Sequence, residues 1–143
     1  MPAQEVRLHA HINAPVERVF AFFADHEKFA TLFGGSCRRV RDGEGDPNGL
    51  HSVRRMGPGP LAFDETITEF VPNERIAYQI SRGGPLKNHL GVIRFSATGD
   101  ATDVDYVIRF DGKLPGVGPL VAKALSLAWH RSSPRALAAL ERA

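Results

Sequence analysis

Hydrophobic and polar residues alternate strictly at the start of the chain. Between residues 5 and 12, every second position is apolar: Val6, Leu8, Ala10 and Ile12. The positions between them are polar: Arg7, His9 and His11. A period of two is typical of a strand that buries one face. We therefore predict a half-buried strand over residues 5–12, with both histidines on its solvent side, where a metal site is not expected.

The apolar spacing then becomes helical. Four apolar residues follow at i, i+3, i+4 and i+7, which is one stripe of a helix: Val16, Val19, Phe20 and Phe23. Pro15 stands where the first turn of a helix tolerates proline. Asp25 can cap a second short helix that carries Phe29 and Phe33. Two short helices are predicted after the first strand.

Short β-rich runs separated by turn residues fill the middle of the chain. The runs are residues 36–40, 50–56, 63–70, 75–80, 88–97 and 103–110, and the turn clusters include 41–49 and 56–60. This pattern predicts an antiparallel meander. With the first strand, the sheet has about seven strands, a usual number.

A long helix is predicted from Pro119 to the end of the chain, after glycine and proline stop the sheet. Its expected apolar stripe is Leu120, Val121, Ala124, Leu125 and Ala128, and its expected polar side is Lys123, Ser126, His130 and Ser133. Pro134 cannot bond to the carbonyl of His130, so we expect a kink or a break there. Only this helix is long enough to cover the apolar face of the sheet, which gives an α+β fold.

Composition limits the function classes. The 143 residues fit a single domain over 1–143, and 43% hydrophobic with 24% charged residues argue against disorder. A net charge of +2 gives no reason to expect a nucleic-acid partner. One cysteine, Cys37, forms no internal disulfide, and no apolar run is long enough for a transmembrane segment. We expect a soluble cytoplasmic protein, a monomer or homodimer.

The chain resembles the START-like or SRPBCC superfamily with its helix-grip fold, and is most similar to the polyketide cyclase/dehydrase-like branch. The resemblance rests on INAPVERVFAFFADHEKF (12–29), DPNGLHSVRRM (46–56), ETITEFVPNERIAY (65–78) and the C-terminal helix. It implies a curved sheet wrapped around the last helix, with an elongated ligand cavity between them. The two short helices would close one end. Many members carry Trp after the second short helix, where this chain has Leu32 and Phe33.

Strand pairing indicates which side chains face that interior. If Gly99–Asp100 is a two-residue turn, counting back from it pairs Phe95 with Val104 and Ile93 with Tyr106. The same count pairs His89 with Phe110, so His89 and the Tyr106 hydroxyl point inward.

The register of the hairpin formed by residues 63–80 is not decided by the sequence. Ile76, Tyr78 and Ile80 face inward, but a two-residue loop at 72–73 places Glu65, Ile67 and Glu69 on their side. A loop longer by one residue places Thr66, Thr68 and Phe70 there, because a one-residue slip exchanges the two faces of a strand. Whether a carboxylate enters the interior depends on this choice.

Under the resemblance, the expected ligand-binding residues are Phe20, Phe23, Phe33, Ile67, Tyr78, His89, Ile93, Phe95, Tyr106, Ile108, Leu125 and Trp129. The candidates for acid–base chemistry are His89, Tyr106, Tyr78 and Glu65, although mutual hydrogen bonding for stability is the preferred interpretation. Cys37 is interpreted as a small buried hydrophobe. The arginines at 38, 39, 41, 54 and 55 are assigned to a solvated convex face. No cofactor motif and no metal ligand set is found.

Three functions remain as hypotheses. The first is a non-catalytic binder or carrier of a hydrophobic small molecule, such as a lipid, an isoprenoid quinone or a polyketide. The second is a cyclase, aromatase or dehydratase that uses acid–base residues in the same cavity. The third is a protein-interaction module without a ligand. An inward polar cluster with a perturbed histidine pKa would favour the enzyme. A wholly apolar cavity would favour the carrier, and an interior without a cavity would favour the interaction module.

Overall fold

The computed structural model describes residues 2–57 and 59–143, so Met1 and Pro58, which belongs to the expected 56–60 turn, lie outside the described residues. The elements follow the predicted order: β1 (Gln4–Ile12), α1 (Val16–Ala24), α2 (His26–Thr31), β2 (Cys37–Arg41), β3 (Val53–Met56), the 3₁₀ turn η1 (Gly59–Leu61), β4 (Phe63–Val71), β5 (Arg75–Gly83), β6 (Leu86–Thr98), β7 (Ala101–Gly112) and α3 (Val117–Arg142).

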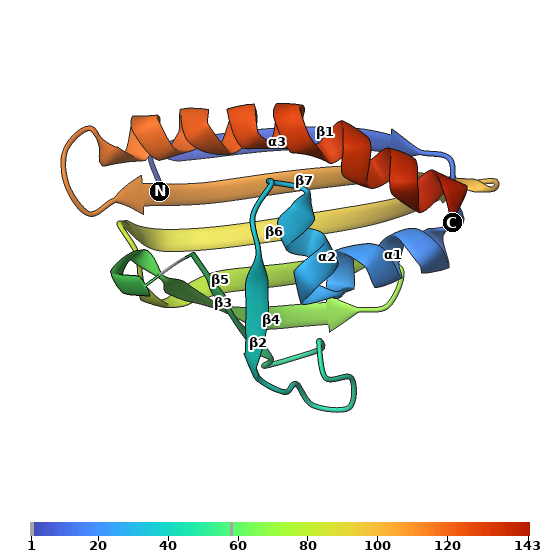
Figure 1. Ribbon diagram of the computed structural model, residues 1–143, viewed down its shortest axis with the longest axis horizontal. Helices are drawn as coiled ribbons and strands as arrows, with labels where there is room; N and C mark the ends of the chain where they lie inside the picture. Colours follow the sequence, from blue (N-terminus) through green and yellow to red (C-terminus); the bar gives the residue numbers. More distant parts are fainter. Residues whose placement is uncertain (1, 58) are drawn as a thin grey trace.

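The seven strands form one antiparallel sheet in the order β1-β7-β6-β5-β4-β3-β2. Consecutive strands from β2 to β7 pair as a meander, and β1 adds to the far edge beside β7. Figure 1 shows α3 lying along β1 and β7, with α1 and α2 in front of the sheet. α2 packs against β2, so the helices and the curved sheet enclose one interior. This is the predicted helix-grip arrangement.

The β6–β7 hairpin confirms most of the predicted register. Thr98 pairs with Ala101, Phe95 with Val104 and Ile93 with Tyr106. The predicted pair of His89 with Phe110 is wrong, because the register shifts between Lys87 and Leu90. Asn88 and His89 form a bulge there, and Asn88 takes a positive φ of 52°. The alternation of apolar residues contained no signal for this extra residue.

In the β4–β5 hairpin, each of the two open registers holds for one half. Val71 pairs with Arg75 across the longer loop, which places Phe70 opposite Ile76. The register then shifts between Ile67 and Glu69, so that Ile67 pairs with Tyr78 and Glu65 with Ile80. The bulge at Thr68 therefore moves the Glu65 side chain into the interior, where it is buried.

Phenylalanines from α1 and α2 fill the space over the concave face. The Phe20 and Phe23 rings meet Phe95 of β6 edge-on, with centroids 5.2 and 5.5 Å apart. Phe29 of α2 reaches Tyr78 at 5.9 Å. Edge-on packing suits the quadrupoles of aromatic rings. The cluster of phenylalanines in the sequence is thus explained by a shared interior that two short helices close.

The helix α3 matches its prediction only in part. It runs without a break through Pro134, although Figure 1 shows its axis bending in the C-terminal half. The predicted apolar stripe is right in part: Val121 and Leu125 are half-buried against the core, whereas Leu120 is 68% exposed and Ala124 is also exposed. The buried residues are Gly118, Trp129, Ser133 and Leu140, with Ala122, Leu125 and Ala136 half-buried on the same line.

This correction follows from where α3 lies. Because α3 packs on the edge strand β1 and on its neighbour β7, only a narrow line of its residues faces the protein. Ser133, expected on the polar side, falls on that line, and Leu120 falls off it. In the described residues, no helix is both long and apolar enough to cross a membrane.

Candidate functional site

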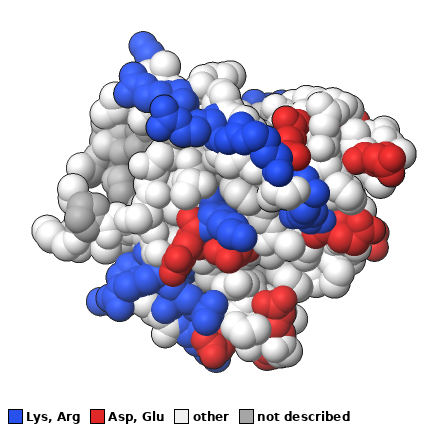
Figure 2. All heavy atoms as spheres, turned by 45° about the vertical axis from the view of Figure 1, so that its right-hand side comes forward, with Lys and Arg blue, Asp and Glu red and all other residues white. Residues whose placement is uncertain are grey.

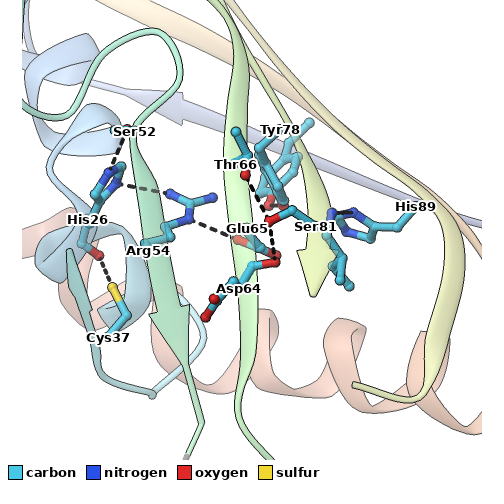
Figure 3. Close-up of polar contacts among 12 residues, drawn as sticks. His26, Cys37, Ser52, Arg54, Asp64, Glu65, Thr66, Tyr78, Ser81 and His89 are labelled. Atoms are coloured by element: carbon cyan, nitrogen blue, oxygen red, sulfur yellow. Dashed lines mark hydrogen bonds and ion pairs between the residues drawn. The ribbon is translucent and has the colours of Figure 1, made fainter. Parts of the chain in front are cut away.

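A charged pair lies in the interior, between neighbouring strands. Arg54 of β3 faces Glu65 of β4 in the register, and its Nε donates to Oε1 of Glu65 at 2.9 Å (Figure 3). The Arg54 side chain is 1% exposed and that of Glu65 is 7% exposed. The assignment of Arg54 to a solvated convex face is therefore wrong. The other face of the same strands carries Arg55, which pairs with Asp64.

Aromatic rings surround the Arg54 guanidinium. Its Cζ lies 4.0 Å from the centroid of the Phe29 ring and 4.6 Å from that of Tyr78. Both distances are within the range of a cation–π interaction. Beyond Tyr78, the rings of Tyr106, Phe33 and Trp129 continue the cluster. The charge is thus held among flat apolar surfaces rather than in water.

His26 of α2 lies on the other side of Arg54. Its Nδ1 is 3.5 Å from Nη1 of Arg54, and its Nε2 is 3.1 Å from the Ser52 hydroxyl. Burial first, and then the charges of Arg54 and Arg39, lower the pKa of His26 to about 3. His26 is therefore neutral at pH 7: Nδ1 accepts from Arg54, and Nε2 donates to Ser52.

One donor of the pair is unsatisfied. Nη2 of Arg54 is buried and has no hydrogen-bond partner among the described residues. Buried donors in folded proteins nearly always have a partner, and a charged donor without one is costly. Nη2 is therefore a buried donor that is free to bind an oxygen acceptor.

Electrostatics keep Arg54 charged. Burial alone would lower the pKa of Arg54, but the carboxylate of Glu65 and the two tyrosines more than offset this, so the pKa lies above its usual value. Burial raises the pKa of Glu65, and the neighbouring guanidinium opposes that rise. The 2.9 Å contact is that of an ion pair.

The two tyrosines contact each other through their hydroxyls. Burial raises the pKa of both Tyr78 and Tyr106 well above the usual range, so both hydroxyls stay protonated. The Tyr78 ring also lies against Gly91 of β6, where an added Cβ would come within 2.3 Å of it. The position of Tyr78 is therefore fixed by close packing on the backbone.

His89 accepts a backbone hydrogen bond. Its Nδ1 takes the N–H of Ile80 at 3.0 Å, and its ring lies 5.4 Å from the ring of Tyr78. Burial first, and then the charge of Arg54, lower the pKa of His89 to about 4. The imidazole is thus neutral at pH 7, and its Nδ1 is already occupied.

The twelve residues expected to bind ligand lie in or against one core cluster. Nine are buried: Phe20, Phe23, Ile67, Tyr78, Ile93, Phe95, Tyr106, Ile108 and Trp129. Phe33, His89 and Leu125 are half-buried. The structure brings all four acid–base candidates to the interior. Sequence reasoning missed Arg54, His26 and Ser52, because the run SVRRM has no apolar alternation that separates an inward arginine from an outward one.

The remaining candidates lie outside this interior. Cys37 is half-buried rather than buried; its Sγ donates to the His26 carbonyl, and burial raises the pKa of the thiol to about 11. His9 and His11 are exposed beside Asp103. Among the described residues, no group of three His, Cys, Asp or Glu side chains is placed to hold a metal.

Solved structures share this fold at low sequence identity. Protein CV1439 from Chromobacterium violaceum has a TM-score of 0.71 at 21% identity, over 96% of both chains. A START superfamily protein from Mycobacterium smegmatis has a TM-score of 0.71 at 20% identity, over 93% of both. DynU16, from the dynemicin biosynthetic locus, has a TM-score of 0.67 at 20% identity; the match covers 98% of this chain and 48% of that one.

No curated protein sequence matches this chain. The family described as "Polyketide cyclase / dehydrase and lipid transport" does match it, over residues 3–143. Fold and family are compatible with binding of a hydrophobic ligand. Since the match spans nearly the whole sequence, the chain belongs to the polyketide cyclase/dehydrase and lipid transport family.

Proposed function

We propose that this protein binds a flat hydrophobic molecule that carries carbonyl or phenolic oxygens, in the interior beside Arg54. The single observation that carries the proposal is the unsatisfied Nη2 of Arg54 inside an aromatic cluster. A ligand oxygen would accept from this donor, and the ligand's rings would replace side-chain contacts with Phe29, Tyr78 and Trp129. Quinone-like and polyketide-like molecules offer both features, whereas a plain acyl chain offers neither.

The directions of the pKa shifts favour binding over acid–base catalysis. A general acid or base works best with a pKa near the operating pH. The inward cluster does contain shifted histidines, but the pKa of His26 falls to about 3 and that of His89 to about 4. The tyrosine hydroxyls are shifted in the opposite direction. The groups therefore recognise oxygen by donating hydrogen bonds, which is what a carrier needs. We propose the cytoplasm as its location, in keeping with one free cysteine.

Arg54 also supports a second candidate, the cyclase or dehydratase. A permanent positive charge in a dry interior stabilises an enolate more than the ketone from which it forms. Such an enzyme would accelerate deuterium exchange at the carbon between the two carbonyls of a 1,3-diketone. Exchange that requires Arg54 would favour this candidate over the carrier.

The test compares two ligands that differ only in oxygen. 2,3-Dimethyl-1,4-naphthoquinone, whose ring positions are blocked against thiol addition, is titrated by calorimetry beside 2,3-dimethylnaphthalene. The quinone should bind at least about tenfold more tightly, ~1.4 kcal/mol, and should raise the melting temperature. The fluorescence of Trp129, the single tryptophan, gives an independent readout. Equal affinity for both ligands, or no saturable binding of either, would contradict the proposal.

A further inference from the structure

A hollow on the surface of the described residues lies outside this interior. It is a groove of about 850 Å³ between α1, α2 and the C-terminal half of α3. Sites for small molecules commonly measure ~300–1,000 Å³. None of the twelve residues expected to bind ligand lines it. The groove therefore needs an explanation of its own.

Four cations border the groove. Arg18 comes from α1, Lys28 from α2, and Arg131 and Arg135 from α3, and no acidic residue is among the lining residues. Figure 2 shows Lys and Arg side chains running as a band across this side of the molecule, at the height of α3. The positive charge thus comes from three separate helices that the fold brings together.

Within residues 2–57 and 59–143, these four cations have no ion-pair partner. Most arginines on the sheet pair with carboxylates, as Arg39, Arg75 and Arg109 do. None of the four groove cations forms a salt bridge among the described residues. Arg131 and Arg135 also stand at i and i+4, where like charges on a helix repel each other. An anion in the groove would remove this repulsion.

Arg18 adds a second observation. Its Nη2 donates to the carbonyls of Leu140 and Glu141 near the end of α3, at 2.8 and 3.3 Å. Its Nε is buried and has no partner among the described residues. The side chain thus holds α3 against α1 at one end of the groove, while one charged donor stays unsatisfied.

The remaining lining residues are mostly apolar or small. Phe22 of α1 and Ala136, Ala139 and Leu140 of α3 provide an apolar surface beside the cations. At Gly34, an added Cβ would lie 2.6 Å from Oγ of Ser132, so the turn after α2 approaches α3 closely there. A molecule that fits this surface has an acidic headgroup and an apolar body.

We propose that this groove binds a small anionic amphiphile, with its phosphate or carboxylate headgroup on Arg131, Arg135 and Lys28 and its apolar part on Phe22 and Ala139. Arginine pairs well with such headgroups through two parallel hydrogen bonds. The site is separate from the interior around Arg54, and the inference does not rest on the function proposed for that interior.

The probe is decyl phosphate below its critical micelle concentration. Two control ligands each carry one of its features: decan-1-ol has the apolar chain and inorganic phosphate has the charged group. Calorimetry should show saturable binding of decyl phosphate, at least about tenfold tighter than either half alone. Arg131→Glu with Arg135→Glu should weaken that binding about tenfold or more. The matched control, Lys113→Glu with Lys123→Glu, changes the net charge equally at the other end of α3 and should stay within about twofold.

Two further variants separate the explanations. Ala139→Trp, at an exposed lining position, should block binding without changing charge. Arg54→Met with Glu65→Leu should leave it intact, which distinguishes the groove from the interior site. Equal binding by both charge-reversed proteins would overturn the proposal, as would inorganic phosphate binding as tightly as decyl phosphate. Association with anionic lipid vesicles but not with monomeric decyl phosphate would also overturn it, in favour of a membrane surface.

Discussion

Replacing Arg54 by Met should destabilise the protein strongly, because the change leaves the Glu65 carboxylate buried without its partner. Removing one member of a buried ion pair costs ~3–5 kcal/mol. The cation–π contacts with Phe29 and Tyr78 add ~0.5–2 kcal/mol. Native domains are stable by only ~5–15 kcal/mol, so the variant should be marginally folded at pH 7.

The double variant Arg54→Met with Glu65→Leu should recover most of that loss. Apolar residues of similar volume often replace a buried ion pair at no cost or with a gain in stability. The cycle is completed by Glu65→Leu alone, which leaves a buried guanidinium unpaired and should also be unstable. Urea unfolding of the four proteins, followed by circular dichroism, measures the coupling energy between the two side chains.

The pH gives an internal check on the cause. In Arg54→Met, the Glu65 pKa should rise further above its unfolded value, because burial is then unopposed. When folding raises the pKa of a carboxyl, the folded protein loses stability as the pH increases from the unfolded pKa of that carboxyl to its folded pKa. The variant should therefore be less destabilised at pH 5 than at pH 7. The reasoning fails if Arg54→Met costs under ~1 kcal/mol, or if the double variant is no more stable than Arg54→Met.

Three other results are expected. Because burial lowers the pKa of His26 to about 3, His26 should take up one proton on unfolding below pH ~6.5, and its contribution to stability should fall by up to ~1.4 kcal/mol per pH unit as the pH is lowered. His26→Gln should therefore flatten the pH dependence of the urea midpoint, and an unchanged slope would rule this out. Gly91→Ala should cost ~1–3 kcal/mol of stability by overpacking against the Tyr78 ring, whereas Gly35→Ala, whose added Cβ has its nearest contact at 3.9 Å, should melt like the parent protein. Equal melting temperatures for the two variants would argue against the contact between Gly91 and Tyr78. His89→Ala should keep naphthoquinone affinity within about tenfold, ~1.4 kcal/mol, and a larger loss by calorimetry would make His89 a direct ligand contact.

Regular alternation is what made the sheet predictable. The Gly99–Asp100 turn and the apolar positions of β7 agree on one register, and the pair Ile93–Tyr106 followed from both. The bulges at Thr68 and His89 could not be predicted, because neither residue type marks a bulge in the sequence.

The candidate site was harder to predict than the fold. Arg54 and Arg55 are the same residue type in consecutive positions, and only the partner strand decides which one turns inward. The predicted apolar stripe of α3 was only partly right, for a related reason. Leu120 and Leu125 both fit an apolar stripe, and only the edge position of the helix on β1 and β7 selects one of them. Both errors concern contacts between elements distant in sequence.

The bulge at Thr68 has a consequence for comparing this protein with its relatives. One added residue decides which face of β4 carries the carboxylate of Glu65. A relative lacking that residue would present the neighbouring side chain to the interior, even where its sequence around the strand looks the same. In such a relative, residues aligned with β4 on one side of position 68 would therefore not occupy the same places in space as those of this protein. Transferring a functional residue within this family requires the length of this strand to be matched first, and residue identity only afterwards.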